Sequence, residues 1–346
     1  MYNVEFHNVS ALEKRVGYEG LLLARFPEEL RHSIDMVGPL ALEENACPEI
    51  RFVTQSPIVR ISVSNLVPTN NSIGENARLH VYRGDFLYDV YPIKKGIINN
   101  IEVSNWGGFG DVDEGALNNA CFSPNVWRFV FTECTPLLHE INTFGFEMRP
   151  PHLDEKPKLT MLAYGSSITH HGSALDGYSY VHHAARRLKF DVINKGTGGS
   201  CFCDNKVADF LANECQWDIA TLELGINTLG KLTVEEFRNR VAYMLKTINR
   251  KHPKKHIWVI DIFSNGGDYK FDLKDKLMHT EQNDKREVVS DEVSKVCSEY
   301  VHYVPGRQLQ PSLEGLTVDL LHPSIWGHIS IGERLAEIIT THLALG

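Results

Sequence analysis

The sequence contains no apolar run that approaches the roughly 18 residues of a membrane-spanning helix. Its start, Met-Tyr-Asn-Val-Glu-Phe-His-Asn, has neither the basic stretch nor the apolar stretch of a secretory signal. Positive charge is also in short supply, because 44 acidic residues outnumber 35 lysines and arginines and leave a formal net charge of −9. A phosphate backbone is bound by a basic surface. We therefore expect neither a membrane nor a nucleic acid as a partner.

Cysteine is sparse in this sequence. The seven cysteines are an odd number and form no zinc-ribbon pattern. Reduced thiols in a cytoplasmic protein are the simplest interpretation. A metal site is the alternative. Its candidate ligands are Cys201 and Cys203 together with the histidines His170, His171, His182 and His183. Because Cys-Phe-Cys lacks a second cysteine pair, we predict no metal and no other cofactor.

What the sequence does contain is enough length for two domains. With 346 residues, of which 42% are hydrophobic and 23% charged, each half can bury a core of its own. The segment 149–158 combines three prolines with alternating charges, which opposes both helix and sheet. We therefore predict a linker there, with a first domain over 1–150 and a second over 151–346.

The first half is typical of a β domain. Short alternating runs are separated by clusters of Asn, Gly and Pro, as in an antiparallel jelly-roll sandwich. Arg83-Gly84-Asp85 indicates a hairpin turn. Strands are expected at 58–64, 79–82, 86–90, 127–131 and 144–148. A short helix is expected near 27–33.

One loop of this domain carries aromatic residues beside glycines. In Trp106-Gly-Gly-Phe-Gly-Asp, Trp106 and Phe109 could stack on a sugar ring. The alternative is that both rings simply pack a turn. The domain is thus a candidate carbohydrate-binding domain.

The second half alternates between strand and helix patterns. The predicted strands are 159–164, 190–194, 217–224, 256–263 and 300–304. Helices are expected at 178–188, at 205–215, after the capping box of Thr233 and Glu236, around 288–296 and at 324–345. This alternation predicts a flavodoxin-like three-layer α/β/α domain with a parallel sheet.

Polar residues follow the strands at the edge where open α/β sheets place their chemistry. Ser167 follows the first strand in Gly165-Ser-Ser-Ile-Thr, Gly199 follows the second, and Asn227 the third. Asp319-Leu-Leu-His322-Pro323 comes near the C-terminus. Acyl transfer needs a nucleophile, a base, a group that orients the base, and donors for the oxyanion.

The Asp-x-x-His spacing can supply two of these groups. One turn of chain separates Asp319 from His322, so the carboxylate can accept from Nδ1 while Nε2 faces the serine. Pro323 holds His322 in an extended conformation and begins the next helix. The backbone N–H groups of Ser167 and Gly199 and the amide of Asn227 would then bind one oxygen.

These four blocks, in this order, resemble the SGNH (GDSL-type) hydrolases over roughly 158–346. The resemblance implies that Ser167 is the nucleophile, His322 the general base and Asp319 its partner. It also implies an oxyanion hole of Ser167, Gly199 and Asn227. A jelly-roll domain before the hydrolase is similar to the arrangement in several SGNH esterases that act on acetylated carbohydrates.

The sequence departs from the family at two positions. Ser166 stands where the family has the aspartate of Gly-Asp-Ser, and Thr228 stands where an aspartate often follows the block-three asparagine. Ser166 is therefore an alternative nucleophile. His328 is the main rival base, although it lacks an aspartate three residues earlier. His170 is a candidate lining residue at the mouth of the site.

We interpret the chain as a serine ester hydrolase that removes acetyl or another small acyl group from a sugar or glycoside. An acyltransferase that uses the same acyl-serine is the alternative within enzymes, and a non-catalytic carbohydrate-binding protein is the alternative outside them. The expected partner is a small acylated sugar or oligosaccharide, and the chain is compatible with a homo-oligomer. The segment 265–284, rich in Gly, Asp and Lys, is expected to be a solvated loop or a flap.

Overall fold

The computed structural model describes residues 2–34, 36, 42–66, 76–105, 107–117, 119–172, 174, 177–269 and 273–343, with backbone only at 114 and 273–279. They form two compact units. The first is Met1–Arg31 with Leu42–Lys158, and the second is Leu159–Gly346 with His32–Ala41. The predicted linker belongs to the first unit, where Arg149 forms a two-pronged ion pair with Glu155 (2.7 and 2.9 Å).

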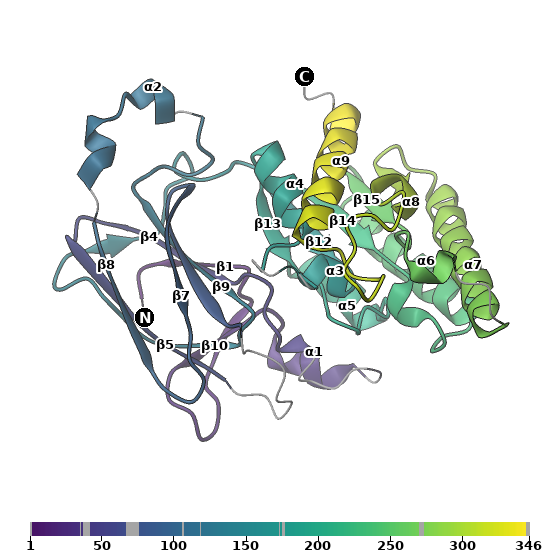
Figure 1. Ribbon diagram of the computed structural model, residues 1–346, viewed down its shortest axis with the longest axis horizontal. Helices are drawn as coiled ribbons and strands as arrows, with labels where there is room; N and C mark the ends of the chain where they lie inside the picture. The colour runs from purple at the N-terminus through teal and green to yellow at the C-terminus, as the bar shows by residue number, and fades with distance from the viewer. Residues whose placement is uncertain are drawn as a thin grey trace. The chain divides into compact units, whose positions relative to one another are not determined.

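The first unit is built from two antiparallel sheets (Figure 1). One sheet has the order β1-β4-β9-β6-β7 with β11 beside β4, and comprises β1 (Glu5–His7), β4 (Glu49–Thr54), β6 (Arg78–Arg83), β7 (Phe86–Pro92), β9 (Val126–Thr132) and β11 (Met148–Arg149). The other has the order β2-β3-β10-β5-β8, and comprises β2 (Ala11–Glu13), β3 (Leu21–Ala24), β5 (Ile58–Asn65), β8 (Asn99–Ser104) and β10 (Pro136–Asn142). Short helices lie between strands: α1 (Glu28–Ser33), η2 (Gly107–Asp111) and α2 (Glu114–Leu117).

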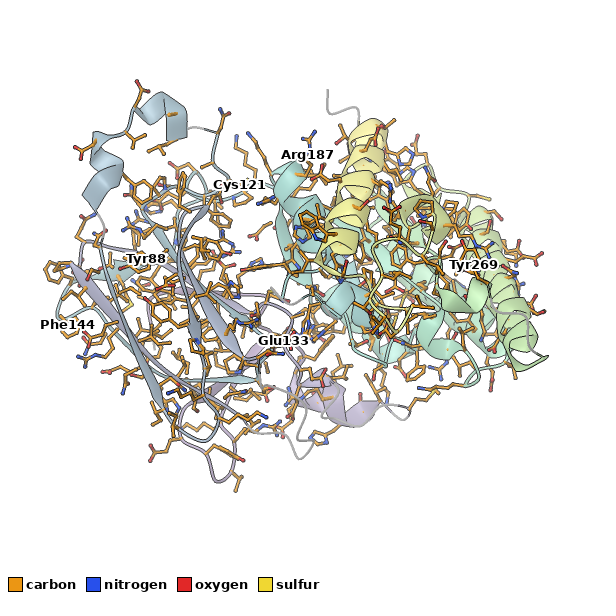
Figure 2. The ribbon with its side chains drawn as sticks, viewed as in Figure 1. Tyr88, Cys121, Glu133, Phe144, Arg187 and Tyr269 are labelled. Carbon is orange, nitrogen blue, oxygen red and sulfur yellow. The ribbon has the colours of Figure 1, made fainter. Side chains whose placement is uncertain are left out.

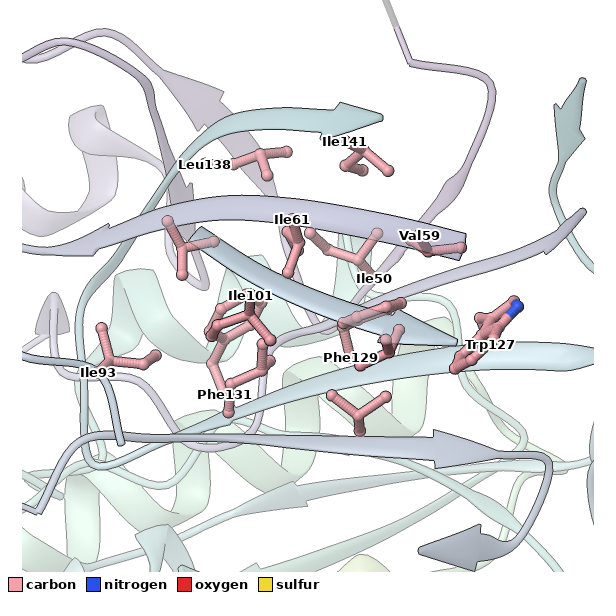
Figure 3. Packing of buried hydrophobic residues seen from close by; sticks show 14 of the residues in the cluster. Ile50, Val59, Ile61, Ile93, Ile101, Trp127, Phe129, Phe131, Leu138 and Ile141 are labelled. Carbon is pink, nitrogen blue, oxygen red and sulfur yellow. The ribbon is translucent and has the colours of Figure 1, made fainter. Parts of the chain in front are cut away.

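The core of this unit lies between the two sheets (Figure 3). Val59, Ile61 and Val63 alternate along β5 and are fully buried. Phe129 of β9 stacks on Phe52 of β4, with ring centroids 5.6 Å apart. Alternate residues of each strand face inward, which buries apolar surface on one face of each sheet. The predicted antiparallel sandwich and its β6–β7 hairpin are confirmed.

The strand expected at 144–148 is wrong. Phe144 and Gly145 have positive φ values of 53° and 90°, so the chain turns there. Phe144 is exposed and projects from this turn (Figure 2). Only Met148 and Arg149 pair, as β11, with β4. Aromatic residues flanking a glycine gave an extended pattern, but the left-handed backbone at Phe144 interrupts it.

The second unit holds a parallel five-stranded sheet with the order β13-β12-β14-β15-β16. Its strands are β12 (Thr160–Tyr164), β13 (Asp191–Asn194), β14 (Ile219–Glu223), β15 (Ile257–Ile260) and β16 (Val301–Val304). This is the flavodoxin-like order, so the predicted fold class is confirmed. The strand order reverses beside β12, which puts the carboxyl ends of β12, β13 and β14 next to each other.

Helices connect the parallel strands and cover the sheet (Figure 1). They are α3 (Ser167–His170), α4 (Tyr180–Leu188), α5 (Asn205–Asn213), η3 (Ile226–Thr228), α6 (Val234–Lys251), η4 (Gly266–Asp268), α7 (Leu273–Val296), α8 (Gly306–Leu309) and α9 (Ile325–Leu343). α4 packs against α9, while α6 packs against both α5 and α7. α6 begins at the predicted capping box of Thr233 and Glu236. None of the helices within the described residues is long and apolar enough to cross a membrane.

The segment 265–284 is not a solvated loop. η4 and the first half of α7 occupy its described part. Asn265 is buried and donates from Nδ2 to Gln282 Oε1 at 2.9 Å. Glycine and charged residues suggested a loop, yet Glu281 and Asp284 lie on α7, whose neighbouring Gln282 is buried.

Candidate active site

The nucleophile turn, residues 165–171, follows β12 directly. Ser166 caps the short helix α3, because its Oγ accepts the Ile168 N–H at 3.2 Å. Ser166 is fully buried, whereas Ser167, the first residue of α3, is half-buried. The buried and hydrogen-bonded Ser166 is therefore poorly placed to act as the alternative nucleophile.

The structure brings Ser167, His322 and Asp319 together. The distance from Ser167 Oγ to His322 Nε2 is 2.8 Å, and that from His322 Nδ1 to Asp319 Oδ2 is 2.7 Å. With Nδ1 donating to the carboxylate, Nε2 is left as an acceptor for the serine proton. The three side chains therefore have the geometry of a nucleophile, a base and an orienting carboxylate.

Asp319 is held in its ionised form. Burial raises its pKa, but hydrogen bonds from the His322 ring, from the N–H groups of His322 and Leu321, and from the Thr317 hydroxyl outweigh this. The net pKa lies well below that of an ordinary aspartate. The carboxylate can therefore orient the His322 ring across the pH range in which the imidazole is neutral.

The predicted oxyanion donors lie at the ends of three adjacent strands. Asn227 accepts the Cys201 N–H on Oδ1 at 3.0 Å, which leaves its Nδ2 group available as a donor. Gly199 is exposed in a turn with φ +63°, a conformation that favours glycine. The Ser167 N–H belongs to the first turn of α3, where backbone donors have no partner within the helix. Their convergence on one oxygen stays a prediction.

His328, the rival base, has a structural place instead. It is fully buried, its Nδ1 accepts the Tyr180 N–H at 3.2 Å, and its Nε2 lies 3.1 Å from the Gly172 carbonyl. Both ring nitrogens are thereby occupied, with Nε2 protonated. A neutral ring with both nitrogens engaged cannot accept a proton from Ser167, so His322 is the better base.

A model of the GDSL-like lipase/acylhydrolase family matches residues 158–340. The chain belongs to this family. The SGNH resemblance is confirmed, and the protein is an acylhydrolase. None of the curated proteins compared with the chain matches it in sequence.

Solved structures of an acyltransferase and of carbohydrate esterases share the fold of this acylhydrolase. The salicylyl-acyltransferase SsfX3 from a tetracycline biosynthetic pathway has a TM-score of 0.80 at 18% identity, with 99% of this chain and 96% of that chain covered. A family two carbohydrate esterase from Cellvibrio japonicus has a TM-score of 0.61 at 12% identity over 99% and 96%. The acetyl xylan esterase Est2A from Butyrivibrio proteoclasticus has a TM-score of 0.59 at 12% identity over 99% and 97%. The shared fold thus includes both units.

The base loop, residues 315–324, is anchored by residues that the sequence did not point to. They are Gly266, Asp268 and Arg286. Gly266 donates its N–H to the Leu320 carbonyl at 2.6 Å, and Leu320 has a positive φ of 55° between Asp319 and His322. The turn that carries Gly266 is fixed by a buried ion pair between Asp268 and Arg286 (2.9 Å). A glycine and a distant arginine gave no sequence signal, since their link to Asp319 exists only in the fold.

The predicted substrate-binding residues have different positions. Trp106 lies outside the described residues. Phe109 belongs to the first unit and packs on Phe86, with ring centroids 5.2 Å apart. His170, at the end of α3, is only 4% exposed, which argues against a ring that lines the mouth. Their contact with substrate stays a prediction.

The alternative metal site has little support from the geometry. Cys201 and Cys203 are both buried, and burial raises the pKa of the Cys201 thiol well above its ordinary value. Thiolate is the form that binds metals. Across the described parts of the chain, no three His, Cys, Asp or Glu side chains are grouped as metal ligands.

Proposed function

We propose that this acylhydrolase cleaves esters through an acyl-serine intermediate on Ser167. The supporting observation is the continuous pair of short contacts from Ser167 Oγ to His322 Nε2 and from His322 Nδ1 to Asp319 Oδ2, at 2.8 and 2.7 Å. His322 takes the serine proton as Oγ attacks the ester carbonyl, and Asp319 stabilises the imidazolium that forms. His322 then gives this proton to the leaving alcohol. A water next gives a proton to His322 and attacks the acyl-serine carbonyl, which releases the carboxylic acid as His322 returns the proton to Ser167 Oγ.

The oxygen of the tetrahedral intermediate would be bound by the Ser167 N–H, the Gly199 N–H and Asn227 Nδ2. Asn227 is held before the reaction, because its Oδ1 accepts the Cys201 N–H at 3.0 Å. Preorganised donors stabilise charge that develops only in the transition state. Their contribution is therefore expected in kcat rather than in KM.

The proposed substrate is a sugar or glycoside that carries acetyl or another small acyl group. The support is the shared two-unit fold with esterases named for carbohydrates and for acetyl xylan. These two proteins are 12% identical to this chain, so their likeness shows a shared fold. The half-buried Ser167 and the partly exposed His322 form an open site, which suits an acyl group presented on a large alcohol.

An acyltransferase is the second candidate. SsfX3, which is named as an acyltransferase, has a TM-score of 0.80, against 0.61 and 0.59 for the two esterases. The two candidates share the acyl-serine and differ in whether water or an alcohol accepts the acyl group. Steady release of p-nitrophenol from p-nitrophenyl acetate is expected for the hydrolase. A burst that stalls and resumes when a sugar is added would instead favour the transferase.

The deciding experiment compares two neighbouring serines. Ser167→Ala should lower kcat for p-nitrophenyl acetate by about 10⁶, as removal of a triad serine does, while the circular dichroism spectrum stays that of the wild type. Ser166→Ala should cost far less. A dead Ser166→Ala beside an active Ser167→Ala would contradict the proposal. Acetate release from acetylated oligosaccharides, measured with the wild type, then tests the substrate class.

A further inference from the structure

The strongest unexplained feature of the acylhydrolase unit is a carboxylate sealed inside it. Glu223, the last residue of β14, is fully buried. Its Oε2 accepts three hydrogen bonds, from the Ser166 N–H (2.7 Å), the Ser166 hydroxyl (2.6 Å) and the Thr169 hydroxyl (3.1 Å). All three donors belong to the nucleophile turn.

We propose that Glu223 is a positioning residue that fixes the nucleophile turn and thereby aims the hydroxyl and N–H of Ser167. This inference rests on the proposed role of Ser167. Glu223 itself does not touch substrate, so it is not a catalytic residue. It acts through Ser166 and Thr169.

The peptide group between Ser166 and Ser167 determines the direction of the Ser167 N–H. Glu223 fixes the N–H of Ser166, and the Ser166 carbonyl accepts the His170 N–H at 2.9 Å. Because a peptide group is planar and trans, the Ser167 N–H must point away from that carbonyl. It is therefore directed out of the helix, as an oxyanion donor requires.

A second layer of hydrogen bonds supports the carboxylate. The Thr169 hydroxyl donates to Glu223, so its 2.9 Å contact with Tyr180 must be donated by the Tyr180 hydroxyl. Gly165 completes the enclosure, because a Cβ there would lie 2.7 Å from Glu223 Oε2. The glycine of this turn is thus needed for the close approach of a carboxylate.

Glu223 also explains why Ser166 can replace the family's aspartate. The Ser166 hydroxyl lies 2.6 Å from Glu223 Oε2, so a carboxylate at position 166 would be placed against a second one. Two carboxylates that share one small site cannot both ionise easily. In this chain the carboxylate comes from β14, and position 166 supplies a small donor to it.

The first test replaces Glu223 and measures kcat and KM for p-nitrophenyl acetate. Glu223→Ala should lower kcat by about 10²-fold, because a small displacement of a reacting group costs about that much, with KM changed less than about threefold. Glu223→Gln keeps one acceptor oxygen and should lose less. The control is Thr221→Val on the same face of β14. Thr221 is equally buried, and its Oγ1 has no hydrogen-bond partner among the described residues.

A fluorophosphonate that titrates reactive serines separates positioning from folding. If Glu223→Ala is folded but its Ser167 is misaligned, every molecule reacts with the fluorophosphonate, but each reacts slowly. If Glu223→Ala gave fewer titratable sites, each with wild-type kcat, Glu223 would be merely structural and the inference would be overturned. A wild-type kcat in a folded Glu223→Ala would overturn it as well. If Glu223→Ala does not fold, Glu223→Gln and Thr169→Val carry the same test, each with an expected loss of about tenfold.

The second test exchanges the two positions. Ser166→Asp alone should lose at least as much kcat as Glu223→Ala, and Ser166→Asp combined with Glu223→Ala should regain at least about tenfold over Ser166→Asp. Additive losses would show that the two positions do not interact, which overturns this explanation. A wild type whose turnover does not depend on Ser167 would instead reject the proposed function itself, so the two failures are distinguishable.

Discussion

The nucleophile turn and the base loop, two short segments that meet at one site, are held in opposite ways. The nucleophile turn rests on the buried side chains of Glu223 from β14 and Asn194 from β13, the latter donating to the Thr169 carbonyl at 2.8 Å. The base loop carries Asp319, which is 45% exposed, and closes on itself through the Thr317 N–H and the His322 carbonyl at 2.8 Å. The serine is thus positioned by the sheet, and the histidine by a loop.

This difference predicts different responses to mutation. Buried polar groups such as Glu223 cannot be removed without leaving other buried groups unpaired, so fold and activity are sensitive together. Asp319 is 45% exposed, so solvent can hydrate the groups left behind when its carboxylate is changed, and the cost in folding free energy should be smaller. Activity and stability should therefore separate cleanly in the base loop and less cleanly in the nucleophile turn.

The largest separation is expected for Asp319→Asn. The amide can no longer hold the His322 tautomer that leaves Nε2 as an acceptor, so kcat should fall by about 10⁴. The melting temperature should change little. Thr317→Val, which removes only one donor to Asp319 (2.7 Å), is the matched control and should lose far less. An Asp319→Asn variant that unfolds would contradict the contrast between the two segments.

A smaller loss is expected at the third strand end. Asn227→Ala should lower kcat by about 10²–10³ with little change in KM. Asn227→Asp keeps an oxygen for the Cys201 N–H but has no donor, so it should lose about as much. If Asn227→Asp kept most of the activity, the residue would serve the Cys201 turn rather than an oxyanion. A pure KM effect would assign it to ground-state binding.

The anchor of the base loop should have a weaker effect. Arg286→Lys loses the paired contacts with Asp268 that fix the turn carrying Gly266. Because Gly266 holds Leu320 from one side only, we expect a fall in kcat of about tenfold with unchanged KM. Arg307→Lys is the control, since Arg307 also contacts Asp268 (2.9 Å) but is 46% exposed. Equal effects of the two changes would mean that the buried pair does not set the loop.

Between pH 7 and pH 5, acid should destabilise the interior of the second unit through His328. Burial lowers the pKa of His328 to about 4, so the folded protein holds it neutral while the unfolded chain protonates it near an ordinary pKa of about 6.5. Stability from this group is complete above pH 6.5 and is lost as the pH falls towards 4. The loss at pH 5 is about 2 kcal/mol. Urea unfolding of wild type and His328→Gln at pH 7 and 5 measures it, and parallel pH dependences would contradict it.

The sequence predicted the second unit nearly element by element, for physical reasons. Each strand there contains a short apolar stretch and is followed by a helix pattern before the next strand, and local caps such as Thr233 with Glu236 mark helix starts. Ser167, Gly199, Asn227, Asp319 and His322 could be named because each stands just beyond a predicted strand or in the last loop. Local chain order determines such an arrangement.

Glu223 and Arg286 could not be found in this way. Glu223 sits between Leu222 and Leu224, and a charge inside a buried apolar strand does signal a partner, but not which one. In the first unit, β4 and β10 were missed because their partners lie far away in the chain. Long-range pairing decides all of these cases.

The contact between Ser167 and His322 joins residues that are 155 positions apart in the chain. Closing so long a segment is slow, because chain entropy must be lost before the contact forms. During synthesis, the ribosome completes the nucleophile turn long before it makes the base. Esterase activity therefore cannot arise in a nascent chain until His322 has been synthesised and the base loop has reached Ser167, so its recovery during refolding reports the formation of this long-range contact.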